Sequence, residues 1–285
     1  MVKIVADSTC DLSDELVDKY DIVIVPLHIM LDEKEYRDGE ELHPDEIFQW
    51  VEDTKKMPKT SAAGMEDVIS VLEPMLEEKD EVIVFCISEK MSTTANVFRM
   101  AAELLNAKDQ ITVVDSENLS AGIGHLVIEA AIMAKEGKSR SEIVEKIEEL
   151  KPCVCSSFVV DTLSYLQKGG RCSSVSAIAG SVLNIHPKII VKNGMMEASK
   201  KYRGTMIKVL MNYVKDMEED LLYAKPDRVF IVHSGCEKEM VDAVYDYLEK
   251  LLYFKEIIVC RAGGVISSHC GPGTLGVLFI RDRKY

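Results

Sequence analysis

The sequence predicts an α/β fold in two parts: an N-terminal α/β/α domain with a mainly parallel sheet, and a C-terminal α+β domain with a mixed or antiparallel sheet. Short apolar strands alternate with helical patterns throughout the first half. The pattern changes after Lys151-Pro152, and Asn193-Gly194 then supplies the positive φ values that a two-residue hairpin turn requires. We therefore expect one domain over residues 1–150 and a second over residues 151–285.

The strands expected in the first half are apolar on both faces, which is typical of a parallel sheet covered by helices on both sides. They end in small polar residues, at Asp7-Ser8-Thr9, Ser88 and Asp115-Ser116. Ligands gather at the carboxyl ends of such strands, but helix caps use the same residue types, and both interpretations stay open. The expected strands are 2–6, 22–25, 82–87 and 111–114; the expected helices are 13–20, 65–76, one starting at 92–94, 119–134 and 141–150.

The second half predicts a different order of elements. The hairpin joins 188–191 to 195–201, and apolar residues at helical spacing predict one helix over 205–221. The helix over 119–134 is apolar nearly all round, so we expect it to be buried between layers. The remaining expected elements are a strand at 153–160, a short helix before Lys168-Gly169-Gly170-Arg171, strands at 229–232, 257–259 and 277–280, and a helix ending at 252.

Charge and hydropathy exclude several classes of partner. The 285 residues include 34 Lys and Arg against 48 Asp and Glu, a formal net charge of −14. Nucleic acid is bound mainly through dense Lys and Arg, so this average charge argues against a nucleic-acid partner. No run reaches the roughly 20 apolar residues that span a bilayer, so no stable membrane insertion is expected.

The cysteines indicate a reducing compartment. Asp7 interrupts the apolar start of the chain before a secretory signal could form. Eight cysteines without an export signal are therefore expected to be reduced thiols in the cytoplasm. Cys153 and Cys155 are only two residues apart, and no CxxC occurs, so the cysteine spacing matches no metal-ligand motif and we expect no metal site.

The common cofactor and catalytic motifs are absent or out of context. Residues 271–276 match G-x-G-x-x-G, but a strand follows them where a dinucleotide site needs a helix, so a tight turn is the better interpretation. Gly122-Ile123-Gly124 has Val127 at the third glycine position. The sequence contains no G-x-S-x-G elbow, H-E-x-x-H or Walker motif, so we expect neither ATP nor NAD to bind and no cofactor.

Hydroxyl side chains gather at two places. Thr60-Ser61 lies in a small-residue loop over 57–64, and Ser92-Thr93-Thr94 begins a helix. A helix start offers free N–H groups and the positive end of the dipole, so this cluster could hold an anion; the alternative is a simple N-cap. His269 stands out among the six histidines because it lies between Ser267-Ser268 and the glycine-rich turn.

An ordered set of motifs resembles the DegV family of bacterial fatty-acid-binding proteins, some of which are the lipid-carrying component of a fatty acid kinase system. Each motif alone is weakly specific, but their order is informative, and the resemblance extends from about residue 3 to 280. The motifs lie at 7–12, 59–61, 87–94, 114–116, 163–171, 201–204 and 269–273.

The resemblance implies an apolar tunnel between the two domains that holds an acyl chain. It implies a carboxylate held by hydroxyls and a histidine. Ala62-Ala63-Gly64 replaces the usual Gln-Pro-Ser, and Thr93 replaces a usual Gly, so the head-group contacts can differ from the family pattern. By resemblance the ligand-binding residues are Thr60, Ser61, Ser92 and His269, and Arg171 and Arg203 lie near the site mouth or a partner surface.

Two functions from different classes follow. The first is a non-enzymatic carrier that binds a long-chain fatty acid such as palmitate and presents it to a partner fatty acid kinase. Burying a 16-carbon chain contributes on the order of 10 kcal/mol before ordering costs, which suffices for tight binding. The alternative is an acyl hydrolase that uses Ser92 with His269. The densest basic group is either a kinase-docking patch or a solvated surface: Lys168, Arg171, Lys200, Lys201 and Arg203.

Overall fold

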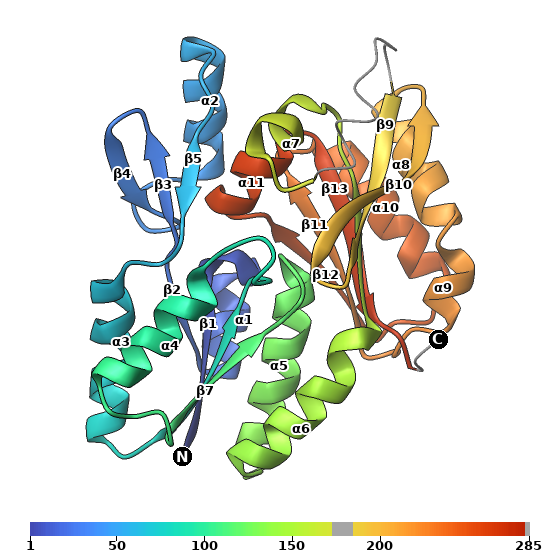
Figure 1. The fold of residues 1–285 in the computed structure, drawn as a ribbon. Coiled ribbons are helices and arrows are strands. Elements are labelled where there is room, and N and C mark those ends of the chain that lie inside the picture. The colour runs from blue at the N-terminus through green and yellow to red at the C-terminus, as the bar shows by residue number, and fades with distance from the viewer. Residues whose placement is uncertain (173–184, 283–285) are drawn as a thin grey trace.

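The apolar runs of the first half form a four-stranded parallel sheet in the order β2-β1-β6-β7 (Figure 1). The computed structural model describes residues 1–172 and 185–282. Each strand has apolar side chains on both faces, and helices cover both, so the predicted N-terminal parallel sheet is confirmed. The strands are β1 (Val2–Asp7), β2 (Ile22–Val25), β6 (Glu81–Cys86) and β7 (Ile111–Asp115).

Helices pack on the two faces of this sheet in separate groups. One face packs against α1, α5 and α6, and the other against α3 and α4. As predicted, α5 is buried between layers, because it packs on β1 and also on β8 and β13 of the second half. These helices are α1 (Asp14–Tyr20), α3 (Met65–Glu77), α4 (Thr94–Leu104), α5 (Ala121–Lys135) and α6 (Arg140–Leu150), with the short 3-10 turn η1 (Ser8–Cys10) after β1.

A small antiparallel sheet, which the sequence patterns do not predict, extends the N-terminal half. Its order is β4-β3-β5, with β3 (His28–Leu31), β4 (Lys34–Arg37) and β5 (Lys59–Ser61). The helix α2 (Pro44–Thr54) lies between β4 and β5. The expected loop at 57–64 is therefore wrong in part, because β5 pairs with β3 and places Thr60 opposite Ile29. Three residues are too few to show an alternating pattern of their own.

The second half forms a six-stranded mixed sheet in the order β10-β9-β8-β13-β11-β12 (Figure 1). Only the β11–β12 pair is parallel among its described pairs, which confirms the predicted mixed sheet. The hairpin is also confirmed, with Asn193 at φ 50° and Gly194 at φ 75°. The strands are β8 (Val154–Val159), β9 (Ile185–Lys192), β10 (Met195–Arg203), β11 (Arg228–Ser234), β12 (Glu256–Arg261) and β13 (Thr274–Ile280).

Helices of the second half cover the outer face of this sheet, and its inner face packs toward α5. The prediction of a single helix over 205–221 is wrong, because the helix is interrupted at Asp216-Met217 and two helices form instead. The outer helices are α8 (Met206–Lys215), α9 (Glu218–Leu222) and α10 (Lys238–Lys250), while η2 (Lys151–Cys153) precedes β8 and α7 (Ser164–Gly169) follows it.

One short helix of the second half reaches across to the first. The helix α11 (Gly264–Cys270) lies between β12 and β13 and contacts α2, β3, β5 and η1 (Figure 1). It carries His269 to the small antiparallel sheet. The predicted domain boundary after residue 150 falls between α6 and η2, and the division into two domains stays a prediction. No helix among residues 1–172 and 185–282 is long and apolar enough to cross a membrane.

Candidate ligand-binding site

A cavity of about 430 Å³ lies at the carboxyl edge of the parallel sheet, where it meets elements of the second half. Its walls include residues that follow β2, β6 and β7, which is where an open α/β sheet collects ligands. Most of its apolar lining comes from the strand ends and from α11: Leu27, Ile87, Met91, Leu119, Met196, Val265, Ile266 and Cys270.

The structure brings five of the six sequence-predicted residues into this cavity. The four residues expected to hold a carboxylate all line it, and Arg171 does so as well. Arg203, on β10, is exposed and is not part of the lining, so only its expected role on a partner surface remains as a prediction. The four carboxylate-binding candidates are Thr60, Ser61, Ser92 and His269.

A hydrogen bond between the two halves of the chain joins Thr60 and His269. The hydroxyl oxygen Oγ1 of Thr60 lies 2.8 Å from Nε2 of His269. Burial, and then the charge of Arg171, lowers the pKa of His269 to about 4, so its imidazole is neutral near pH 7. A neutral ring carries one N–H, and a threonine hydroxyl both donates and accepts. This pair can therefore offer a donor to an anion without a buried positive charge.

The second nitrogen of the His269 ring faces a tightly packed backbone. Nδ1 is buried and has no hydrogen-bond partner within the described part of the chain. A Cβ atom added at Gly169 would lie only 2.5 Å from it. Glycine at the end of α7 therefore permits the close approach that fixes the ring plane, which gives the Gly169-Gly170 motif a packing role next to the site.

Ser92 is engaged by the helix that follows it. Its Oγ lies 2.9 Å from Oγ1 of Thr94 and accepts the Thr94 backbone N–H at 3.3 Å. Thr93, not Ser92, is the N-cap residue of α4. Ser92 lines the cavity, and its role in holding an anion stays a prediction. No hydrogen bond joins Ser92 to His269, although both are described, so the nucleophile–base contact that a hydrolase needs is missing.

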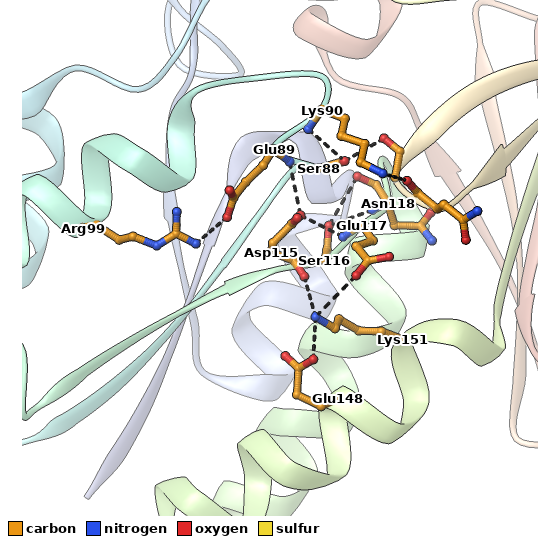
Figure 2. Close-up of polar contacts among 12 residues, drawn as sticks. Ser88, Glu89, Lys90, Arg99, Asp115, Ser116, Glu117, Asn118, Glu148 and Lys151 are labelled. Atoms are coloured by element: carbon orange, nitrogen blue, oxygen red, sulfur yellow. Dashed lines mark hydrogen bonds and ion pairs between the residues drawn. The ribbon is translucent and has the colours of Figure 1, made fainter.

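Contacts across the cavity wall tie the β6–α4 loop to the tip of the β9–β10 hairpin (Figure 2). Ser88 Oγ donates to the carbonyl of Gly194 at 2.7 Å, and Lys90 Nζ donates to the carbonyl of Asn193 at 2.7 Å. Asp115 accepts the N–H of Glu89 at 3.2 Å from the neighbouring strand end. The predicted polar strand ends thus hold the loop and hairpin that line the cavity, rather than all facing a ligand.

The glycine-rich turn after His269 has the structure predicted for it. Gly271 and Gly273 both have φ of 76°, and the turn connects α11 to β13. A Cβ atom on Gly271 would lie 2.6 Å from the Tyr165 ring, so the close approach requires glycine. The residues that sequence reasoning missed are the apolar ones on α11, because Val265 and Ile266 show their role only once this segment is known to be helical.

A half-open, mostly apolar cavity where elements of the two sheets meet is typical of α/β proteins that bind small molecules. The chain belongs to the DegV family, whose sequence model matches residues 1–282. It is 33% identical over 280 residues to a DegV domain-containing protein of Caldanaerobacter subterraneus, covering 98% of each chain.

Solved structures give the same result. A DegV family protein from Thermus thermophilus, described by its fatty acid binding, has a TM-score of 0.90 and 34% identity, over 98% of this chain and 99% of that one. A stearic acid-binding protein from Eubacterium ventriosum has a TM-score of 0.86 and 30% identity, over 99% of this chain and 98% of that one. The predicted fold class and family are therefore confirmed.

Proposed function

We propose that this protein binds a long-chain fatty acid, with the acyl chain against the apolar cavity lining and the carboxylate at Thr60, Ser61, Ser92 and His269. The observation that carries this proposal is the Thr60–His269 hydrogen bond inside a cavity of about 430 Å³ whose remaining lining is largely apolar. A related protein of 34% identity is described by its fatty acid binding, and another of 30% identity by stearic acid binding.

The energetics suit such a ligand. Each buried methylene contributes about 0.8 kcal/mol, so the chain supplies most of the affinity. A hydrogen bond to a charged group contributes about 1.5–3 kcal/mol, so the head group fixes orientation and discriminates acids from neutral lipids. Neutral donors such as Thr60 hold a carboxylate without neutralising it, which leaves its oxygens nucleophilic.

The direct test is lipid extraction from the purified protein. Denaturing the protein and analysing the extract by mass spectrometry should release about one long-chain fatty acid per chain. Protein stripped of lipid should rebind palmitate in a competition titration against a fluorescent fatty acid. Protein that carries no fatty acid and does not bind added palmitate would overturn the proposal.

We further propose that the protein is a non-enzymatic carrier that presents the bound carboxylate to a partner fatty acid kinase in the cytoplasm. Cysteines in both halves of the chain, among them Cys10 and Cys270, are free thiols, in keeping with a reducing compartment. Arg203 is exposed and lies outside the cavity, so it is available to a partner, while Arg171 lies at the cavity.

A reconstituted phosphorylation assay tests the carrier role. With a fatty acid kinase and ATP, Arg203→Ala should lower the rate of acyl-phosphate formation while palmitate affinity stays the same. Lys238→Ala, on the exposed side of α10, is the matched control and should change neither quantity. An unchanged rate for Arg203→Ala would remove Arg203 from the docking surface.

A further inference from the structure

Two aspartates from the first half of the chain hold the start of α11. Asp11 Oδ1 accepts the backbone N–H of Gly263 at 2.8 Å, and Asp38 Oδ1 accepts that of Gly264 at 2.7 Å. The first N–H groups of a helix have no partner within the helix. Gly263 at the N-cap has no side chain to satisfy them. The caps of α11 therefore come from residues more than 220 positions earlier in the sequence.

The other oxygen of each carboxyl group also has a hydrogen-bond partner. Asp11 Oδ2 accepts the Ser120 hydroxyl at 2.5 Å, and Asp38 Oδ2 accepts the Ser8 hydroxyl at 2.9 Å. Ser8 Oγ in turn accepts the backbone N–H of Leu27, which lines the cavity, at 3.1 Å. The network thus joins η1, the start of α5, the residues after β2 and the start of α11.

Both carboxyl groups are deeply buried, with 5% of Asp11 and 3% of Asp38 exposed. Burial raises the pKa of Asp11 to about 8 and also raises that of Asp38. Burying such groups is costly unless every oxygen has a partner. Neither aspartate lines the cavity, so their placement is not explained by direct ligand contact.

Glycine makes this approach possible. A Cβ atom on Gly264 would lie 2.8 Å from Asp38 Oδ1, and one on Gly263 would lie 3.2 Å from Asp11 Oδ1. The backbone of α11 therefore meets the two carboxyl groups at a distance that a larger residue would increase.

We propose that Asp11 and Asp38 are positioning residues that fix α11, so that His269 stays in hydrogen-bond contact with Thr60 and the cavity selects a carboxylate over an uncharged head group. This inference rests on the proposed function. A hydrogen bond weakens steeply with distance and angle, whereas burial of an acyl chain is non-directional. A small shift of α11 therefore affects head-group recognition far more than chain binding.

The test compares two probes, palmitate and methyl palmitate, which share the chain and differ in the head group. In Asp38→Ala and Asp11→Ala, affinity for palmitate should fall by roughly tenfold or more, the effect of one hydrogen bond to a charged group, while affinity for the ester is unchanged. Asp38→Asn, which retains a carbonyl acceptor, should recover part of the selectivity.

Asp80→Ala is the matched control, because Asp80 is also buried but pairs with the N-terminal amine at the opposite edge of the parallel sheet. It should leave the ratio of the two affinities unchanged. Gly264→Ala keeps both aspartates and displaces α11 through the added Cβ atom. It should cause the same loss of selectivity for palmitate, and it replaces Asp11→Ala or Asp38→Ala if either variant does not fold.

Three outcomes separate the inferences. If the ratio of the affinities for palmitate and methyl palmitate is unchanged in Asp38→Ala and Gly264→Ala, the positioning role is overturned. This holds whether both probes bind more weakly to the same degree, which would show a general structural role, or neither does. Wild-type protein that binds neither probe would instead overturn the proposed function. Selectivity in the wild type that is lost in the variants supports both.

Discussion

The half-buried neutral donor Thr60 should matter more for fatty-acid affinity than the exposed charge of Arg171. Thr60→Val keeps the branched shape on β5 but removes the hydroxyl that bonds His269 at 2.8 Å. A hydrogen bond to a charged group contributes about 1.5–3 kcal/mol, so Kd for palmitate should rise roughly 10- to 150-fold. A partly buried interaction is screened by salt much less than an exposed one, so this loss should depend little on salt.

Arg171→Met should have a smaller effect. Arg171 is exposed at the cavity, and its Nη1 donates to the Gly169 carbonyl at 2.8 Å. Exposed ion pairs contribute about 0.2–1 kcal/mol, which corresponds to a change of roughly 1.4- to 5-fold in Kd. Burial is the larger cause of the low pKa of His269, so the imidazole should stay neutral in this variant.

A competition titration with palmitate at about 0.01 M and 0.15 M salt separates the two effects. The loss in Arg171→Met should shrink as salt rises, and the loss in Thr60→Val should not. Thr54→Val, at an exposed threonine on α2, is the matched control and should bind like the wild type. A larger loss in Arg171→Met than in Thr60→Val would refute the reasoning, because the head group would then be held mainly by charge.

Three further predictions concern stability. Gly194→Ala should destabilise the protein more than Gly39→Ala in urea denaturation: both glycines have φ near +80°, but a Cβ at Gly194 would lie 2.6 Å from Ser88 Oγ and one at Gly39 meets nothing within 4 Å. Equal losses would mean that the hairpin contact is not tight. Burial lowers the pKa of His125 from 6.5 to about 3, so the unfolded state binds more protons between these values and stability is lost as pH falls through them. His125→Gln should lose less unfolding free energy than the wild type between pH 6.5 and 4; an equal loss would contradict this assignment. Burial raises the pKa of Asp11 from 3.8 to about 8, so its contribution has the opposite sign: the folded state binds more protons, and stability is lost as pH rises from about 4 to 8. Asp11→Asn should remove this loss when the unfolding free energy is measured between pH 4 and 8, and a variant that keeps it would rule Asp11 out as the cause.

Elements with a strong local signal could be predicted from the sequence. The apolar runs at β6 and β7 predicted a covered parallel sheet, and Asn193-Gly194 predicted the hairpin. The even apolar coverage of α5 predicted that it lies between layers. In each case the residues that form the element also carry the pattern that identifies it, so no distant contact is needed to infer it.

The site itself depends on elements without such a signal. β5 has three residues and exists through its pairing with β3, and α11 has seven residues and begins at Gly263-Gly264, a poor helix start. Local sequence and the family motifs both indicate Thr60 and His269 as site residues, but nothing in either segment predicts the hydrogen bond between them.

The long elements could be predicted and the short ones could not for a physical reason. A long amphipathic or apolar segment gains enough from burial to fix its own structure, whereas a segment as short as α11 gains too little and takes its conformation from its partners. Here those partners are Asp11 and Asp38, which cap the helix from the other half of the chain. In this protein the candidate site is built from short segments such as β5 and α11, because the longer apolar segments form the two main sheets and their covering helices. It follows that substitutions in the capping aspartates should alter head-group recognition while leaving the two sheets in place, a combination that a sequence pattern alone does not foretell.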